Sequence, residues 1–125
     1  MSLLRDTFKE RSAENWDAAV ACQGSQRFNA AANRYYYAVY QAVVYWADQK
    51  KLVRCERSHA GFHQTLPELL AEHGGDSGKD FRDIFADVYA LRIQADYKHP
   101  VAEKHLKRDL IQKADVVRKS LLKPI

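Results

Sequence analysis

The sequence predicts an all-α protein, an up-and-down antiparallel bundle of four main helices and one short helix that spans residues 1–125 as a single domain. Apolar residues recur every three or four positions, which is the spacing of one helix face. No segment alternates with the period of two that a half-buried strand shows. The connections between the expected helices are short, which favours antiparallel neighbours. A chain of 125 residues is also long enough to bury its own core.

The segment 28–47, FNAAANRYYYAVYQAVVYWA, is the most apolar part of the chain and predicts a helix over about 27–51. All but four of its twenty residues are apolar or aromatic, and no Gly or Pro interrupts it. Apolar side chains therefore cover most of the circumference, whereas an ordinary surface helix buries one stripe. We expect this helix to lie at the centre of the bundle or to carry an interface. Its tyrosines are expected to pack in the core or in a dimer interface rather than to stack on bases: Tyr35, Tyr36, Tyr37 and Tyr40.

Two helices are expected beside this central one. The first runs over 3–22, and its buried side carries Leu4, Phe8, Trp16, Ala19 and Val20. Gly24 ends it, and Ser25 is available to cap the central helix. The other helix begins at His59, and Pro67 is expected to kink it or to divide it into two short helices, because proline removes a hydrogen bond and clashes with the preceding turn.

The C-terminal half predicts two more helices after the HGGDSG turn. Asp76 or Ser77 caps the fourth, which ends near Lys98 because the residue before a proline is pushed out of the helical region. Pro100 is expected to be the first residue of the fifth helix. The buried side of that helix is expected to hold Leu106, Leu110, Ala114, Val117 and Leu121. Its exposed side is expected to hold Lys104, Lys107, Arg108, Arg118 and Lys119.

The charge is distributed unevenly along the chain, whose net charge is +4. Residues 1–97 hold 12 basic and 13 acidic side chains, whereas residues 98–125 hold 8 basic and 3 acidic ones. The basic segment is either a solvated helix face or a patch that attracts phosphate groups. No apolar run reaches the ~20 residues that span a bilayer, and the charged N-terminus is unlike a secretion signal. We therefore expect a cytoplasmic protein, with no membrane contact, in which Cys22 and Cys55 are free thiols too far apart to be bridged.

Three motifs stand in order in the chain: NRYYYA at 33–38, SHAG at 58–61 and RIQADY at 92–97. Together they resemble the small prokaryotic HEPN domains, and the resemblance covers about residues 5–122. It implies a helical bundle, usually homodimeric, whose dimer groove gathers polar residues from the fourth helix. Many such proteins are encoded beside a minimal nucleotidyltransferase and form a toxin–antitoxin pair with it. Several branches are metal-independent ribonucleases with an Arg-x(4–6)-His motif, and others bind nucleotides or RNA without catalysis.

Arg92 and His99 are the catalytic residues that this resemblance implies. The common catalytic form has an asparagine after the arginine and a histidine five positions beyond it, whereas Tyr97 occupies that position here. His99 satisfies the widest spacing but stands directly before a proline. Arg92 and Asp96 are one helical turn apart, so we expect an i,i+4 ion pair that either fixes the helix end or holds a phosphate-binding arginine. The residues expected to bind nucleotide or RNA are Arg34, Asp96, Tyr97, Lys104 and Arg108.

Two further polar features have a structural and a functional interpretation. Arg34 lies in the polar seam of the central helix, where a charge needs a partner. We expect an ion pair with Asp87 or Asp96 more than a ligand contact. His59 and His63 have a spacing that can hold a metal on one helix face. However, neither HExxH nor a Glu-x-x-His pair is present, so no metal and no cofactor are expected.

Three functions remain open at the level of the sequence. The first is a HEPN-like nucleotide- or RNA-associated protein, homodimeric and paired with a minimal nucleotidyltransferase in a toxin–antitoxin system. The second is a metal-independent endoribonuclease toxin in which His99 is the general base for a ribose 2′-hydroxyl and Arg92 stabilises the charge on phosphorus. The third is a structural adaptor dimer without a ligand. Whether the chain is an enzyme is left open.

Overall fold

The computed structural model describes residues 3–55 and 62–124 and shows an all-α helical bundle, with no strand in those two ranges. Its α-helices are α1 (Leu3–Gly24), α2 (Phe28–Gln49), α3 (Phe62–His73), α4 (Gly78–Tyr97) and α5 (Arg108–Leu121). A 3-10 turn, η2 (Gly75–Ser77), lies between α3 and α4, and another, η3 (Glu103–His105), lies between α4 and α5. Both cysteines are free, as predicted. No described helix is both long enough and apolar enough to cross a membrane.

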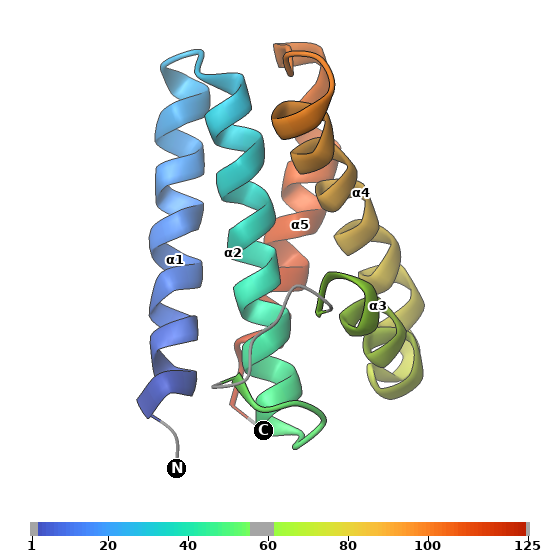
Figure 1. Ribbon diagram of the computed structural model, residues 1–125. Helices are drawn as coiled ribbons and strands as arrows, with labels where there is room; N and C mark the ends of the chain where they lie inside the picture. Colours follow the sequence, from blue (N-terminus) through green and yellow to red (C-terminus); the bar gives the residue numbers. More distant parts are fainter. Residues whose placement is uncertain (1–2, 56–61, 125) are drawn as a thin grey trace.

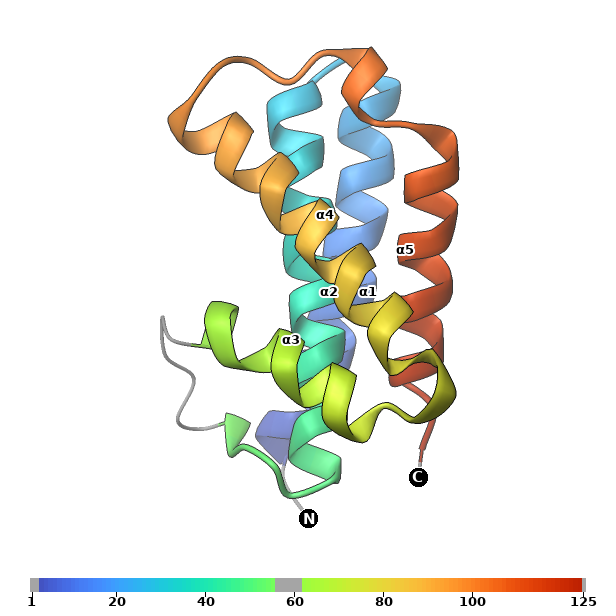
Figure 2. The ribbon, with the colours of Figure 1, turned by 90° about the vertical axis from the view of Figure 1, so that its right-hand side faces the viewer.

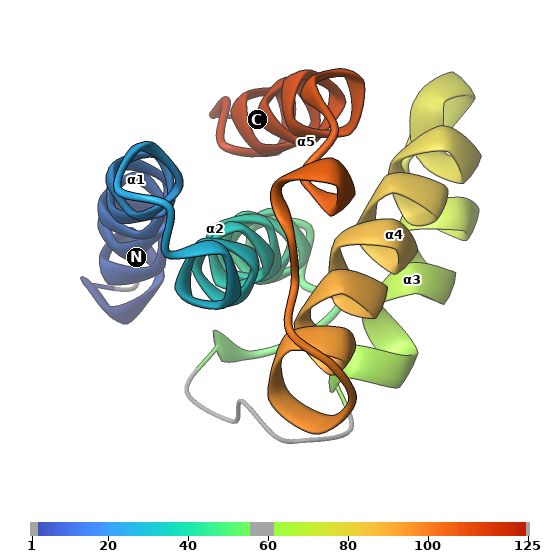
Figure 3. The ribbon, with the colours of Figure 1, turned by 90° about the horizontal axis from the view of Figure 1, so that it is seen from above.

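The other four described α-helices are arranged around α2 (Figure 1). α1 lies along α2 and runs in the opposite direction, with the short turn between them at the top of the view. Seen from above, α2 lies between α1 and α4, and α5 lies on a third side of it (Figure 3). α4 is inclined to both α2 and α5, and α3 packs against its lower half (Figure 2).

The core of the bundle is α2 itself, which confirms its predicted central position. Thirteen of its residues are buried, and they point in all directions around the helix axis. Contacts from α1, α3, α4 and α5 cover them. A partner subunit is therefore not needed to remove the apolar circumference of this helix from water. Three of the four tyrosines expected in the core are fully or nearly buried: Tyr35, Tyr36 and Tyr40.

α1 is held to α2 by apolar and polar contacts along its length. Trp16 packs edge-on against Tyr35 with ring centroids 4.8 Å apart. The buried Ser12 hydroxyl donates a hydrogen bond to the Ala38 carbonyl oxygen over 2.6 Å. The predicted buried side of α1 is wrong at two positions, since Val20 is 51% exposed and Leu4 is 37% exposed. The three- and four-residue spacing indicates a helix, but α1 buries a narrower stripe than the apolar pattern suggested.

The connections between helices confirm some boundary predictions and correct others. α1 ends at Gly24 as predicted, but the N-cap of α2 is Arg27 rather than Ser25, and its side chain makes no capping hydrogen bond. α4 begins directly after Ser77 and ends at Tyr97, as predicted. The Ser77 side chain makes no capping hydrogen bond, however, and Asp76 lies within η2. The order of the turns is thus correct, whereas the expected side-chain caps are absent from these helix starts.

Pro67 does not divide the third helix, because α3 continues through it from Phe62 to His73. The proline removes one hydrogen bond, the one that would go to the carbonyl of His63, at a cost of about 3 kcal/mol. The neighbouring Leu66 and Leu70 are fully buried, and this packing offsets that cost. The predicted helix start at His59 lies outside the described residues.

The predicted start of the fifth helix at Pro100 is wrong, because α5 begins at Arg108. Hydrogen bonds to side chains hold the preceding residues in an irregular path. The Val101 amide donates to Asn29 Oδ1 over 2.6 Å, and the Ala102 amide donates to His105 Nδ1 over 2.9 Å. Val101 and Leu106 are both buried, so two apolar anchors keep the connection on the core. Leu106 is buried as predicted, but it precedes the helix.

The predicted exposed side of the fifth helix is correct for four of its five residues: Lys104, Lys107, Arg108 and Lys119. Arg118 is instead buried, with 8% of its surface exposed. Its guanidinium lies 5.1 Å from the Trp16 ring centroid, and its Nη2 is 2.8 Å from Asp115 Oδ1. The aromatic face and the carboxylate compensate for the burial of this charge.

Candidate functional site

A cluster of rings lies where α2, α3 and α4 meet. We call it the aromatic cluster; it consists of Tyr36, Tyr37, Tyr40, His63, Phe85 and Tyr89. Tyr36 is its centre, and each of the other five rings has its centroid between 5.2 and 5.9 Å from that of Tyr36. Tyr36 is fully buried, whereas Tyr37, His63 and Tyr89 are half-buried. The cluster therefore extends from the core to the surface.

Helical spacing brings these side chains together. Tyr36 and Tyr40 are one turn apart on α2. Tyr89, Arg92 and Asp96 follow one another at intervals of three and four residues along α4, so they share the face that meets α2. α3 supplies His63 from its first turn.

The hydroxyl of Tyr36 forms a hydrogen bond with Nδ1 of His63. Burial raises the pKa of Tyr36, so the phenol keeps its proton and needs an acceptor. His63 Nδ1 is the hydrogen-bond partner that the described residues provide, so we assign the phenol as donor and Nδ1 as acceptor. Burial, and then the positive charge of Arg92, lower the pKa of His63. A neutral imidazole that accepts at Nδ1 carries its proton on Nε2, which makes Nε2 a hydrogen-bond donor.

Arg92 lies at the edge of the aromatic cluster. Its guanidinium carbon is 5.5 Å from the ring centroid of Tyr36 and 5.4 Å from that of Tyr37. Nε lies 3.2 Å from Asp96 Oδ2, which confirms the predicted i,i+4 ion pair. The Nε–H does not point at that oxygen, and it makes no hydrogen bond within the described part of the chain. The side chain is 15% exposed, so the two rings and one carboxylate hold a guanidinium that still reaches the surface.

The other residues expected around Arg92 do not join it. Tyr97 is the last residue of α4 and is 70% exposed. His99 is exposed beyond the helix end, and within the described residues no contact links it to Arg92. Lys104 in η3 and Arg108 at the start of α5 are exposed at the end of the molecule opposite α3 (Figure 2).

Arg34 has a different partner from the one predicted. Its Nη1 donates to Asn15 Oδ1 of α1 over 3.1 Å, rather than pairing with Asp87 or Asp96 of α4. The reason is the direction of its side chain, because Arg34 and Tyr36 are separated by about 200° around the axis of α2. Arg34 therefore faces α1 when Tyr36 faces α3 and α4, and it is not part of the aromatic cluster.

Sequence reasoning missed His63 as a neighbour of Arg92. The sequence pairs His63 only with His59, as a possible metal ligand, and His59 lies outside the described residues. Among the residues that the structure describes, no group of three or more His, Cys, Asp or Glu side chains could hold a metal ion. The interval of four residues between Arg92 and Asp96 was visible in the sequence and predicted their ion pair. The approach of α3 that brings His63 to the same place was not visible.

No family model, no curated protein and no solved structure matches this chain. Its function therefore has to be inferred from the side chains themselves. The arrangement around Arg92 offers a fixed guanidinium, a neutral imidazole with a donor at Nε2, and half-buried tyrosine rings. Such groups can bind a phosphate together with a planar ring.

Proposed function

We propose that this chain is a HEPN-like nucleotide- or RNA-binding protein and that Arg92 is its phosphate-binding residue. The observation that carries the proposal is the position of Arg92, stacked on Tyr36 and Tyr37 and paired with Asp96 through Nε. A guanidinium fixed in this way loses little side-chain entropy when it binds a phosphate. Its Nη groups make no hydrogen bond to any described residue and can form a two-pronged contact with phosphate oxygens.

His63 and Tyr37 give this site a second and a third contact. His63 Nε2 can donate to another phosphate oxygen or to a ribose hydroxyl, because the imidazole is held neutral and its Nδ1 is already occupied by Tyr36. Tyr37 is half-buried beside Arg92, and the part of its ring face that is open to solvent can stack on a base. These contacts favour a nucleotide over a free phosphate ion.

The partners belong to the same proposal and rest on the resemblance of the three sequence motifs. They are a second copy of the chain, in an up-and-down antiparallel HEPN-type bundle, and a minimal nucleotidyltransferase of a toxin–antitoxin-type pair. The apolar surface of α2 gives no separate support for a dimer, because the chain buries that helix by itself.

Ribonuclease activity through Arg92 and His99 stays a prediction, and the positions of these two residues do not support it. The helix ends at Tyr97, and the next residue, Lys98, has φ −121° and ψ −103°, so the chain leaves the helical direction before His99. A general base must come within about 3 Å of the proton that it removes. His99 is exposed beyond this point, and no contact within the described residues links it to Arg92.

The test is RNA binding by Arg92 variants, measured by fluorescence anisotropy with a labelled single-stranded RNA of about 12 nucleotides at low salt, where phosphate contacts are strongest. Arg92→Ala is expected to weaken binding about tenfold, and Arg92→Lys to restore it only in part because lysine cannot form the fork. Arg82→Ala is the matched control, since Arg82 lies on the same helix with 40% of its side chain exposed and also pairs with an aspartate, Asp83, over 3.1 Å.

Equal losses in the Arg92 and Arg82 variants would mean that binding reflects net charge alone, and the proposal would then be wrong. The same would follow if the wild-type protein bound no RNA and no ATP at low salt. RNA cleavage in EDTA that both Arg92→Ala and His99→Ala abolish would replace binding by the ribonuclease function.

A further inference from the structure

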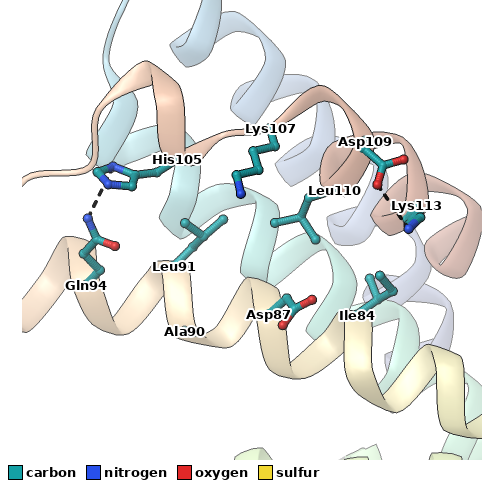
Figure 4. Close-up of a pocket in the computed structure, with 10 residues that line it drawn as sticks. All are labelled: Ile84, Asp87, Ala90, Leu91, Gln94, His105, Lys107, Asp109, Leu110 and Lys113. Carbon is teal, nitrogen blue, oxygen red and sulfur yellow. Dashed lines mark hydrogen bonds and ion pairs between the residues drawn. The ribbon is translucent and has the colours of Figure 1, made fainter.

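A groove runs between α4 and α5 on the side of α4 away from the aromatic cluster. Figure 4 shows one part of it, a hollow of about 480 Å³ with Leu91 and Leu110 at its floor and Lys107 reaching in from the α5 side. A second hollow of about 630 Å³ adjoins it. The two hollows share Ile84, Asp87, Asp109 and Lys113, so they form one continuous groove. It exists because α4 is inclined to α5 and the two helices diverge (Figure 2).

The floor of the groove is apolar and partly open to solvent. It is formed by Phe81, Ile84, Leu91, Leu110, Val116 and Val117. Val116 is 60% exposed and is one of four large apolar residues that are exposed in the described ranges. The rest of α5 gives no local reason for an exposed valine, because the buried side of that helix already carries Ala114, Val117 and Leu121. An apolar strip of this kind is typical of a surface that another helix covers.

The charges at the rim indicate which kind of helix fits. Asp80, Asp83 and Asp87 follow the edge on α4, and Asp109 lies on the α5 side. Lys107 and Lys113 are the two cations that line the groove, so carboxylates outnumber ammonium groups. Lys113 is already paired with Asp109 over 3.1 Å. Within residues 3–55 and 62–124, Asp80 and Asp87 form no ion pair, and they leave the α4 edge negative.

We propose that this groove binds an amphipathic α-helix of a partner protein that carries lysine or arginine along one edge. From Asp80 to Gln94 the groove follows α4 for about 20 Å, the length of roughly 14 helical residues. Apolar residues of the partner at intervals of three and four cover Val116 and Ile84, and its basic edge lies against the three aspartates. This inference does not rest on the proposed nucleotide site, because Asp87 and Arg92 are about 140° apart around α4.

The test uses two designed helical peptides of about 16 residues with the same leucine stripe, one with lysine and one with glutamate along the edge. Anisotropy of the labelled peptides is measured with the full chain. The lysine peptide is expected to bind about tenfold more tightly than the glutamate peptide, because it meets the aspartate edge. Asp87→Lys is expected to shift the preference towards the glutamate peptide.

Val116→Asp is expected to weaken binding of the lysine peptide about tenfold, since a carboxylate would interrupt the apolar floor. The matched control is Val20→Asp, because Val20 is an exposed valine, 51% exposed, on α1 outside the groove. Circular dichroism melts of both variants verify that they fold. Arg92→Ala should leave peptide binding unchanged, so a failure of this proposal is distinct from a failure of the nucleotide site.

Equal affinity for the two peptides, absence of binding, or equal effects of the two valine variants would each overturn the proposal. A second copy of the chain is the rival occupant, because its own residues 98–125 are basic. Sedimentation of the protein distinguishes the two: a wild-type dimer that Val116→Asp converts to a monomer would assign the groove to self-association and would refute a separate partner.

Discussion

Arg92, Tyr36 and His63 influence one another through charge and burial. Tyr36 keeps its proton because it is buried, and its hydroxyl therefore occupies Nδ1 of His63. Arg92 lies over the Tyr36 ring, and its positive charge adds to the burial that lowers the pKa of His63. The imidazole is consequently uncharged at neutral pH, so the site carries one cation, Arg92, which Asp96 balances. A bound phosphate would therefore accept hydrogen bonds from a charged donor, Arg92, and from a neutral one, His63 Nε2, at a site without an excess of positive charge.

The lowered pKa of His63 predicts a stability that decreases in acid. The unfolded chain takes up a proton at the ordinary histidine pKa of about 6.5, before the folded chain does. The contribution of His63 to the unfolding free energy is thus fully present above about pH 6.5. It decreases as the pH falls from there to the pKa of the folded state. The melting temperatures at pH 7.5 and pH 5.5 are expected to differ less in His63→Gln than in the wild type. His99→Gln, at an exposed histidine, is the control and should keep the wild-type difference; an equal effect of both variants would contradict the assignment.

The helices α3 and α4 are joined through a close contact at two glycines. An added Cβ at Gly74 or at Gly78 would collide with the backbone carbonyl oxygen of Leu70. Both distances are too short for any side chain, so the tight turn that brings α3 against α4 requires glycine there. This contact matters for function because α3 carries His63 and α4 carries Arg92.

Gly78→Ala is therefore expected to destabilise the protein by about 1–3 kcal/mol, as overpacking against a rigid backbone does. Gly24→Ala is the matched control, because Gly24 is also a helical glycine and its added Cβ has no atom within 4 Å. There the gain in helix propensity should leave stability unchanged or raise it by up to about 1 kcal/mol. Urea unfolding measures both variants. Equal stability of the two would show that the Leu70 carbonyl can move away.

The helices differ in how well the sequence predicts them. α2 was predictable in position and in length, because an uninterrupted apolar segment can only be buried. The start of α5 was not, because the acceptors that hold Val101 and Ala102 belong to Asn29 and His105, and only the folded chain brings Asn29 there. Arg118 was assigned to the wrong side for the same reason, since its position in the helix does not reveal the Trp16 ring on α1. The ion pair between Arg92 and Asp96 is local and was predictable; the arrival of His63 depends on tertiary contacts and was not.

At the scale of the whole molecule, the start of α2 is tied to the connection between α4 and α5. Asn29 and Val101 are 72 residues apart in sequence, and one hydrogen bond of 2.6 Å joins them. The same connection places the buried Val101 and Leu106 on the core and then begins α5. The groove between α4 and α5 depends on it, because the connection sets where α5 begins and hence how far it lies from α4 (Figure 3).

Asn29→Ala leaves the Val101 amide without its acceptor, and we expect a loss of about 1–2 kcal/mol of stability, the range for an unsatisfied, partly buried donor. Asn33→Ala is the matched control, because it is the same substitution on the same helix and the Asn33 side chain makes no hydrogen bond to the described residues. Hydrogen exchange gives the local readout. The Val101 amide should exchange faster in Asn29→Ala and remain protected in Asn33→Ala. Unchanged protection of the Val101 amide in Asn29→Ala would mean that the buried Val101 and Leu106 side chains hold the connection without this hydrogen bond. The groove should then bind the lysine peptide equally well in both variants.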